Sequence, residues 1–424
     1  MNEQFLHHLW KFRLLTNDLL TADGEEVVVL HPGQHNRDSG PDFLNARIRI
    51  GKTLWAGNVE CHVRSSDWLR HKHQDDEAYQ NIILHVVYES DKIIRRSNGE
   101  MIPEVALKGR FNALLYERYR DMMENMNWIP CEKLMDEVHP LIVRSMLERL
   151  LVERLEEKEG HILQTYQACN NDWEEAFYFM LARNFGFRLN SGPFELLAKS
   201  LPFKVLSRHR DDIFQIEALL YGQAGMLKKK YHDAYPRKLA KEYRFLQKKY
   251  ALKPIDPHLW KFLRLRPSNF PTIRISQFSC LLCQSQGLFS EVISSQQLYD
   301  LRNLFDLKCS EYWTSHYIFD RKSVSITKRI GVKTVDLLLI NTVIPFIFVY
   351  GMSKDNPGLK ERALDFLTKL PAEENSISNQ WRHLGIKMDC AFSSQAMMEL
   401  KEHYCDQKRC LDCKIGHAIL KKEC

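Results

Sequence analysis

Two acidic residues near the N-terminus of this 424-residue chain have the type and spacing of a metal-binding pair. Asp42 ends the turn-forming sequence that begins at Asn36, and Glu60 follows eighteen residues later. The residues between them predict a β-hairpin, with one acid entering the first strand and the other on the second. Such a pair can place two carboxylates side by side, as a divalent cation requires if it is to polarise a phosphodiester. We therefore predict Mg²⁺ or Mn²⁺ at Asp42 and Glu60.

Other polar residues crowd this pair in the sequence. His62 can act as a base near neutral pH or ligate the metal itself, and the backbone carbonyl of Cys61 can complete the metal site. The alternative is that these groups are ordinary strand-end and turn residues, since the sequence before Phe43 has good turn chemistry. The further candidates for supporting roles are Asp67, His71, His73, Tyr79 and His85.

The elements that must position these residues follow in the order helix, strand, strand, strand, helix, strand. The predicted ranges are an amphipathic helix over 2–21, a strand over 25–30, a hairpin over 46–63, a helix beginning at 65–67 and an apolar strand over 81–89. From about residue 111, apolar residues recur at intervals of three and four and predict helices. We therefore expect an α/β domain over 1–110 and a mainly α-helical region over 111–424.

This order of elements, together with the two acids and His62, resembles the core of the PD-(D/E)xK nucleases with histidine in the lysine place. The resemblance implies a restriction-endonuclease-like αβββαβ core in which Asp42, Glu60 and His62 are catalytic. Glu3 stands where some members carry an additional acid. Because lysine orients or activates the attacking water in these nucleases, its replacement leaves two functions open. One is a metal-dependent nuclease acting on DNA, and the other is an inactive module of the same fold that binds nucleic acid or a protein partner.

Several short sequences lie along the chain, including Leu9-Trp10-Lys11, Gly40-Pro-Asp-Phe43, Gly57-Asn-Val-Glu60, Leu84-His-Val-Val87 and Arg266-Pro-Ser-Asn-Phe-Pro-Thr-Ile-Arg274. Together they resemble one uncharacterised bacterial family, the domain-of-unknown-function family 2851. That family carries no established activity, so the resemblance implies architecture rather than chemistry. It extends along nearly the whole chain as far as the C-terminal cysteines.

The most basic segment, residues 228–274, has the ingredients of a nucleic-acid surface, because its cations can follow phosphates and its interleaved aromatic residues can stack on bases. The alternative is a solvated helix whose aromatic residues pack inward. Arg266 and Arg274 flank a proline-containing loop, where guanidiniums can clamp a phosphate or tie down helix ends. We predict contacts with DNA from Lys248, Lys249, Arg266 and Arg274.

Three cysteines near the C-terminus, Cys405, Cys410 and Cys413, have the spacing of metal ligands. Their spacing equals that of the first three ligands of a plant-type [2Fe–2S] site, and zinc fits equally well. Some nucleases of the resembled class hold an iron–sulfur cluster on C-terminal cysteines and one distant upstream cysteine, which Cys131 would match, although the C-terminal spacing differs. The candidates for a fourth ligand are Cys390, which we favour, and Cys424, Cys131 and His417.

The composition is that of an ordinary soluble globular protein, with 44% hydrophobic and 27% charged residues and a mild net charge of +6. The most apolar stretch, residues 335–352, is interrupted by Asp336, Asn341 and Pro345, which favours a buried segment over a membrane span. The N-terminus shows no secretory leader, and the eleven cysteines indicate a reducing compartment. We expect a cytoplasmic protein with no membrane partner, and the sequence leaves the oligomeric state open.

Overall fold

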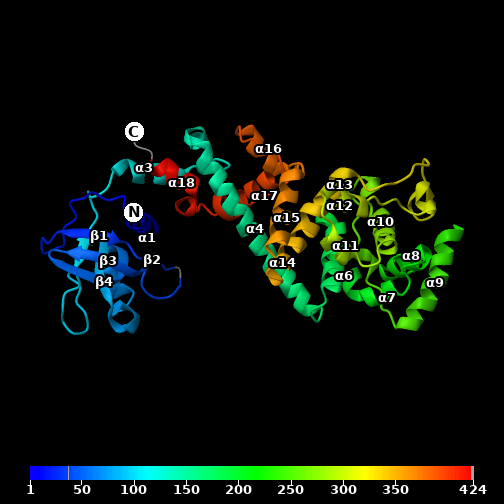
Figure 1. The fold of residues 1–424 in the computed structure, drawn as a ribbon, viewed down its shortest axis with the longest axis horizontal. Coiled ribbons are helices and arrows are strands. Elements are labelled where there is room, and N and C mark those ends of the chain that lie inside the picture. Colours follow the sequence, from blue (N-terminus) through cyan, green and yellow to red (C-terminus); the bar gives the residue numbers. More distant parts are fainter. Residues whose placement is uncertain (37, 422–424) are drawn as a thin grey trace. The chain divides into compact units, whose positions relative to one another are not determined.

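The structure, a computed structural model, describes residues 1–36 and 38–421 (Figure 1). The chain forms two compact units. The first comprises Met1–Met146 together with the segment that begins at Leu400, and the second comprises Leu147–Glu399. Helix α4 (Pro140–Ala168) passes from the first unit into the second. The change in sequence pattern near residue 110 therefore lies inside the first unit, ahead of the division between the compact units.

One mixed sheet forms the centre of the first unit. Its strands are β1 (Val27–His31), β2 (Gln34–His35), β3 (Phe43–Ile50), β4 (Thr53–Arg64), β5 (Ile82–Glu89) and β6 (Glu104–Ala106). They lie in the order β1-β3-β4-β5-β6, with β2 paired to β3. Strand β3 is antiparallel to both β1 and β4, whereas β5 is parallel to both β4 and β6. The prediction of an N-terminal α/β region is confirmed at this level.

Helices and turns complete the first unit. They are α1 (Glu3–Lys11), α2 (Asp67–Arg70), η1 (His73–Asp75), η2 (Glu77–Tyr79), α3 (Ala113–Glu124), η3 (Glu132–Glu137), η8 (Leu400–Cys405), η9 (Cys410–Asp412) and α18 (Lys414–Lys421). Helix α1 packs its buried face against β4. The predicted helix over 2–21 was too long, because Arg13 adopts a left-handed conformation with φ of 52°. The Leu14 N–H then donates to the Leu9 carbonyl at 2.9 Å, as in a Schellman ending.

The parallel pairing of β4 with β5 places polar residues in a row inside the sheet. Glu60 pairs with His85, and His85 pairs with Glu104, so these three side chains share one face. His62 lies two residues after Glu60 on β4 and therefore points to the same face. All four residues are buried. A polar row of this kind requires internal hydrogen-bond partners, because water does not reach it.

The second unit is mainly helical, as predicted. Its elements after α4 are α5 (Trp173–Phe185), α6 (Phe187–Ser200), α7 (Phe203–Ser207), α8 (Ile213–Gln223), α9 (Ala234–Tyr250), η4 (Pro257–Leu259), η5 (Pro267–Asn269), α10 (Pro271–Gln284), α11 (Leu288–Ser294), α12 (Leu298–Leu304), η6 (Glu311–Thr314), β7 (His316–Ile318), β8 (Arg321–Lys322), α13 (Val332–Leu338), η7 (Leu339–Val343), α14 (Ile344–Ser353), α15 (Pro357–Lys369), α16 (Ser376–His383) and α17 (Ala391–Glu399).

Among the described residues, one helical segment, Val332–Ser353, is long and apolar enough to cross a membrane. In this structure 78% of its most apolar stretch is buried inside the protein. The core helix of a soluble protein meets the same criteria of length and composition, so the segment is weak support for a membrane span.

A buried carboxylate links α8 to α10 and to η6 in the second unit. Glu217 is fully buried and accepts hydrogen bonds from the Ser276 hydroxyl at 2.6 Å and the Ser310 hydroxyl at 3.0 Å. Tyr235 also donates to it. Burial raises the pKa of Glu217 to about 7, although the hydroxyl donors oppose the shift. The native state therefore holds a proton that an unfolded glutamate releases near its ordinary pKa of 4.5.

We predict that a Glu217→Gln variant removes a pH-dependent loss of stability. Because the folded pKa lies above the unfolded one, the wild type loses stability as the pH rises from 4.5 to about 7. At about 1.4 kcal/mol per pH unit, this group lowers the free energy of unfolding by about 3 kcal/mol. The measurement is urea unfolding of both proteins at several pH values. The free energy of unfolding of the wild type, relative to that of the variant, should fall by this amount as the pH rises. A pH-independent difference, like that expected for the exposed Glu311→Gln control, would contradict the assignment.

Candidate functional site

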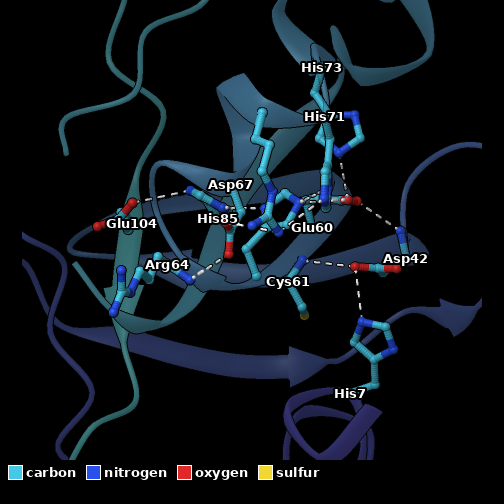
Figure 2. Close-up of polar contacts among 12 residues, drawn as sticks. His7, Asp42, Glu60, Cys61, Arg64, Asp67, His71, His73, His85 and Glu104 are labelled. Carbon is cyan, nitrogen blue, oxygen red and sulfur yellow. Dashed lines mark hydrogen bonds and ion pairs between the residues drawn. The ribbon is translucent and has the colours of Figure 1, made fainter. Parts of the chain in front are cut away.

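The two predicted acids meet in the structure (Figure 2). Asp42 directly precedes β3, and the pairing of Phe43 with Val59 brings it beside Glu60 on β4. The Asp42 N–H donates to Glu60 Oε2 at 3.1 Å, and the Cys61 N–H donates to Asp42 Oδ2 at 2.9 Å. These reciprocal bonds fix the two carboxylates relative to the strand backbones. The hairpin that sequence patterning predicts is therefore what assembles the acidic pair.

The charges of this pair are only partly compensated by the protein. Glu60 is 5% exposed, and burial raises its pKa, an effect to which the charge of Asp42 adds. Burial, together with the neighbouring carboxylates of Asp42, Glu60 and Glu3, raises the pKa of Cys61 well above its usual range. Without a bound cation, Cys61 is therefore a neutral thiol. A bound cation would offset the cost of two adjacent buried carboxylates.

Helix α1 supplies a residue that sequence reasoning missed. His7 Nε2 lies 3.1 Å from Asp42 Oδ2. Glu3, one helical turn earlier, is close enough to act electrostatically on Cys61, as expected for an acid near the site. The spacing of four residues between Glu3 and His7 was the available signal, because it places both on one side of a helix.

On the other side of Glu60, three histidines converge. His62 Nε2 lies 3.2 Å from His71 Nδ1, and His73 Nε2 lies 3.3 Å from Glu60 Oε1. One ring nitrogen from each histidine lies within 4.8 Å of those of the other two. The structure thus brings together His62, His71 and His73, which are widely different in exposure: His62 is 1% exposed, whereas His71 reaches solvent. Figure 2 shows Glu60 between these histidines and Asp42.

A hydrogen-bonded chain runs behind His62 through the polar row. Glu104 Oε2 lies 3.1 Å from His85 Nδ1, and His85 Nε2 lies 2.9 Å from His62 Nδ1. The Glu104 carboxylate can only accept, so His85 Nδ1 carries a proton and His85 Nε2 is left as an acceptor. His62 Nδ1 must then be the donor to His85. The lone pair of His62 therefore lies on Nε2, which faces His71, His73 and Glu60.

The environment keeps His62 neutral. Burial, followed by the neighbouring imidazoles of His85, His73 and His71, lowers the pKa of His62 to about 2. A histidine this difficult to protonate is a weak base at neutral pH. The lone pair of His62 therefore stays unprotonated at neutral pH, as a metal ligand requires.

The other predicted supporting residues have different roles. The Tyr79 ring stacks on His73 with centroids 3.9 Å apart, and so fixes the position of that imidazole. Asp67 is buried at the start of α2, where it accepts from the Arg64 N–H at 3.1 Å and pairs with Arg70. The predicted helix that begins here is only one turn long, because Lys72 adopts a left-handed conformation with φ of 63°.

A cavity of about 490 Å³ in the first unit borders the acidic site through His7. Its wall carries cations from α1 and from the C-terminal segment, namely Lys11, Lys408 and Arg409, and Arg409 pairs with Asp412 in the same wall. The side chains of His7 and Asp42 are 18% and 22% exposed, so the Asp42 side of the site is accessible to solvent. A cavity with positive side chains beside two carboxylates can hold the phosphates of a ligand whose charge the acids alone would repel.

The C-terminal cysteines lie close to Cys131. Burial raises the pKa of Cys405 well above its usual range, and the thiols of Cys131, Cys413 and Cys410 raise it further. Burial and then Cys413 raise the pKa of Cys131 to about 12. Each thiolate that forms would disfavour the next, unless a metal cation held them.

Contacts between the two segments that carry these cysteines support the grouping. Lys408 Nζ donates to the Met123 carbonyl, and Lys401 Nζ lies 5.0 Å from the centre of the Trp128 ring. Tight turns follow two of the cysteines, with Lys408 N–H donating to the Cys405 carbonyl at 3.1 Å.

The other candidates for the fourth ligand have different surroundings. Cys390 belongs to the second unit and contacts Ser393. The His417 ring lies against His8, and Cys424 lies outside the described residues. Cys131, which lies near Cys405 and Cys413, is the fourth-ligand candidate that these contacts support, and Cys390, which we favoured from the sequence, stays a prediction.

The predicted nucleic-acid contacts separate into two groups. Lys248 and Lys249 near the end of α9 are exposed, and so is Arg266 before η5. Arg274 is 5% exposed, bonds to Gln277 at 2.9 Å, and stacks on an aromatic ring. The guanidinium of Arg274 thus ties the start of α10 to its neighbours, and the exposed cations carry the prediction of DNA contact.

A second cavity lies beside α9 in the second unit. Its volume is about 640 Å³, and sequence reasoning did not identify it as a pocket. The basic residues that line it are Lys228, Lys229, Lys230, Arg237 and Arg244. This concentration of positive charge suits a polyanionic ligand.

One protein family matches most of the chain. The model of the family described as protein of unknown function (DUF2851) matches residues 3–376. The chain belongs to this family. No curated protein and no solved structure matches the chain. The DUF2851 match contains the acidic pair, the histidines and Cys131, but it ends before Cys405, so the predicted extension of the resemblance to the C-terminal cysteines is not part of it.

In this DUF2851 protein, the close approach of β4 to β5 at Gly57 makes a packing prediction. A Cβ at Gly57 would lie 2.4 Å from Ile83 Cγ2 and 2.8 Å from the Asn81 carbonyl oxygen. We therefore expect Gly57→Ala to lower the free energy of unfolding by about 1–3 kcal/mol through overpacking. Gly160→Ala is the matched control, because a Cβ there meets nothing within 4 Å, and its stability should be unchanged or higher. Equal urea-unfolding curves for Gly57→Ala and wild type would contradict this packing.

Proposed function

We propose that this protein is a metal-dependent nuclease-like phosphodiester hydrolase that acts on DNA. The observation that carries the proposal is the pairing of Asp42 and Glu60 through the Asp42 and Cys61 N–H groups, at 3.1 and 2.9 Å. Two carboxylates and the Cys61 carbonyl form an oxygen-donor set that suits Mg²⁺ or Mn²⁺.

The sheet topology supports a restriction-endonuclease-like core for this proposal. Three strands, β1, β3 and β4, form an antiparallel meander, and β5 then adds in parallel to β4 after a short helical connection. Helix α1 covers the sheet beside β4. The proposal is supported by the positions of Asp42, directly before the second meander strand, and Glu60, on the third, because the nuclease resemblance implies acids there.

The protein's own residues would bind and orient the substrate. A bound divalent ion would supply a water of lowered pKa and a Lewis acid for a phosphoryl oxygen. Asp42 and Glu60 would hold that ion, and Lys11, Lys408 and Arg409 in the adjoining cavity would balance phosphate charge. His7, in contact with Asp42, would fix the orientation of that carboxylate.

DNA is the proposed partner because positive charge gathers in both units. The cavity beside α9 is lined by five basic side chains, and Lys248, Lys249 and Arg266 are exposed on the same unit. The ten described cysteines are all free, which supports the proposed reducing, cytoplasmic location.

The second candidate function is a non-cleaving nucleic-acid or protein-binding module, favoured by the weakly basic His62 in the lysine place.

We predict that the full-length protein cleaves DNA in the presence of Mn²⁺ and that Asp42→Asn and Glu60→Gln each lower the rate at least about 100-fold, because each removes a charged ligand of the proposed metal ion. The measurement is gel analysis of single- and double-stranded DNA incubated with each variant. The exposed Glu100→Gln is the matched control and should cleave like the wild type.

The outcomes separate the two candidate functions. Loss of cleavage in the two site variants, with DNA binding unchanged, supports the nuclease. DNA binding by a wild type that does not cleave supports the binding module instead. Cleavage that persists in both variants contradicts the assignment of the acidic pair.

We also propose a structural metal, either zinc or an iron–sulfur cluster, at Cys131, Cys405, Cys410 and Cys413. Four buried or half-buried thiols near one another fit the donor chemistry of both. Such a site would fix the segment that carries Lys408 and Arg409 at the cavity beside His7.

Two cysteine variants test which residue is the fourth ligand. We predict that Cys131→Ser removes the metal, whereas Cys390→Ser retains it. Anaerobically purified proteins should be compared by visible absorbance and by elemental analysis for zinc and iron. A wild type without either metal would contradict the site, and metal loss in Cys390→Ser alone would restore Cys390 as the ligand.

A further inference from the structure

We propose that His62, His71, His73 and Glu60 form a binding site for a first-row transition-metal ion that prefers imidazole ligands, such as Zn²⁺ or Fe²⁺. The site lies on the histidine side of Glu60, opposite Asp42 (Figure 2). It concerns the same part of the sheet as the proposed nuclease but can be tested without any cleavage reaction.

The separations between the donor atoms match those around one metal ion. With metal–ligand bonds of about 2.0–2.1 Å, two ligands of a tetrahedral zinc site lie ~3.3 Å apart. His62 Nε2 lies 3.2 Å from His71 Nδ1, and Glu60 Oε1 lies 3.3 Å from His73 Nε2 and 3.7 Å from His62 Nε2. The nitrogens of the three histidines lie within 4.8 Å of one another, and Glu60 Oε1 lies beside those of His62 and His73, so these donors would shift inward to contact a common ion.

One donor in this cluster lacks a protein partner of good geometry. Among the residues that the structure describes, the buried His73 Nε2 makes no hydrogen bond, although it approaches Glu60 Oε1 at 3.3 Å. A metal ion between these two atoms would give both of them a partner. Stacking with Tyr79 holds the His73 ring in this orientation.

The chain behind His62 prepares its Nε2 as a ligand. Glu104 fixes the proton of His85 on Nδ1, and His85 in turn fixes that of His62 on Nδ1, at distances of 3.1 and 2.9 Å. Carboxylate–histidine contacts of this kind set the tautomer and basicity of metal-binding histidines. Glu104 and His85 are therefore positioning residues, and their burial is explained by this task.

The donor set determines the class of ion. Three imidazole nitrogens and one carboxylate favour zinc, iron or a similar ion, whereas Mg²⁺ prefers oxygen ligands and water. The exposure of His71 gives an ion a path from solvent. The oxygen donors on the Asp42 side remain the place for Mg²⁺ or Mn²⁺ in the proposed nuclease.

Zinc binding to the full-length protein tests the site directly. Chelator-treated wild type, His71→Ala/His73→Ala and the exposed-histidine control His258→Ala are titrated with Zn²⁺ by calorimetry, in a large excess of Mg²⁺ and without DNA. The double variant should bind one Zn²⁺ fewer per chain, or bind it at least about 100-fold more weakly. The control should match the wild type, and Cys131→Ser should retain the histidine-dependent site.

Equal stoichiometry and affinity in the double variant and the wild type would overturn the proposal, and so would complete displacement of Zn²⁺ by Mg²⁺. Zinc binding without DNA cleavage would leave this site in place while refuting the nuclease.

A variant that leaves every proposed ligand intact gives a second test. Glu104→Gln should weaken Zn²⁺ binding about 10–100-fold, because an amide no longer fixes the His85 tautomer. Glu100→Gln is the exposed control on the same segment and should bind like the wild type. Unchanged affinity in a folded Glu104→Gln protein would contradict the positioning chain.

Discussion

The row of buried polar side chains across β4, β5 and β6 is the constraint on which the rest of the site depends. Glu60, His85 and Glu104 are in register on adjacent strands, in a part of the sheet that is covered on both faces. Buried polar groups require partners, so each position limits the chemistry of the next. The carboxylate of Glu104 sets the tautomer of His85, and His85 sets that of His62. The same row leaves Glu60 between the histidines and Asp42. Its carboxylate can therefore bind a metal ion either with Asp42 or with the histidines.

The first unit brings the two ends of the chain together around this sheet. Helix α1 contacts the acidic pair through His7, and the segment after Leu400 lines the cavity that borders the same residue. Cys131 lies close to the cysteines of that segment. A metal held there would stabilise one wall of the cavity rather than take part in chemistry at Asp42. The proposed structural and functional metal sites therefore have separate ligands but a shared cavity.

Local patterns were sufficient to predict the hairpin, the acidic pair and the helical character of the second unit. Alternation and turn residues define β3 and β4, and once these strands pair, Asp42 must lie near Glu60. The role of Glu104 was not predictable, because it depends on the parallel addition of β6, a short strand with little pattern of its own. The grouping of Cys131 with the C-terminal cysteines is likewise a contact between distant parts of the chain. Helix α1 was overpredicted because its apolar periodicity continues past the left-handed Arg13.

Metal binding at the histidine side of Glu60 is the central claim, and anomalous diffraction tests it most directly. Crystals of the full-length protein grown with Zn²⁺ would be measured on both sides of the zinc absorption edge. The predicted result is an anomalous peak about 2.0–2.2 Å from His62 Nε2, His71 Nδ1 and Glu60 Oε1. An anomalous map with zinc only at the cysteines, and none among these histidines, would contradict the account.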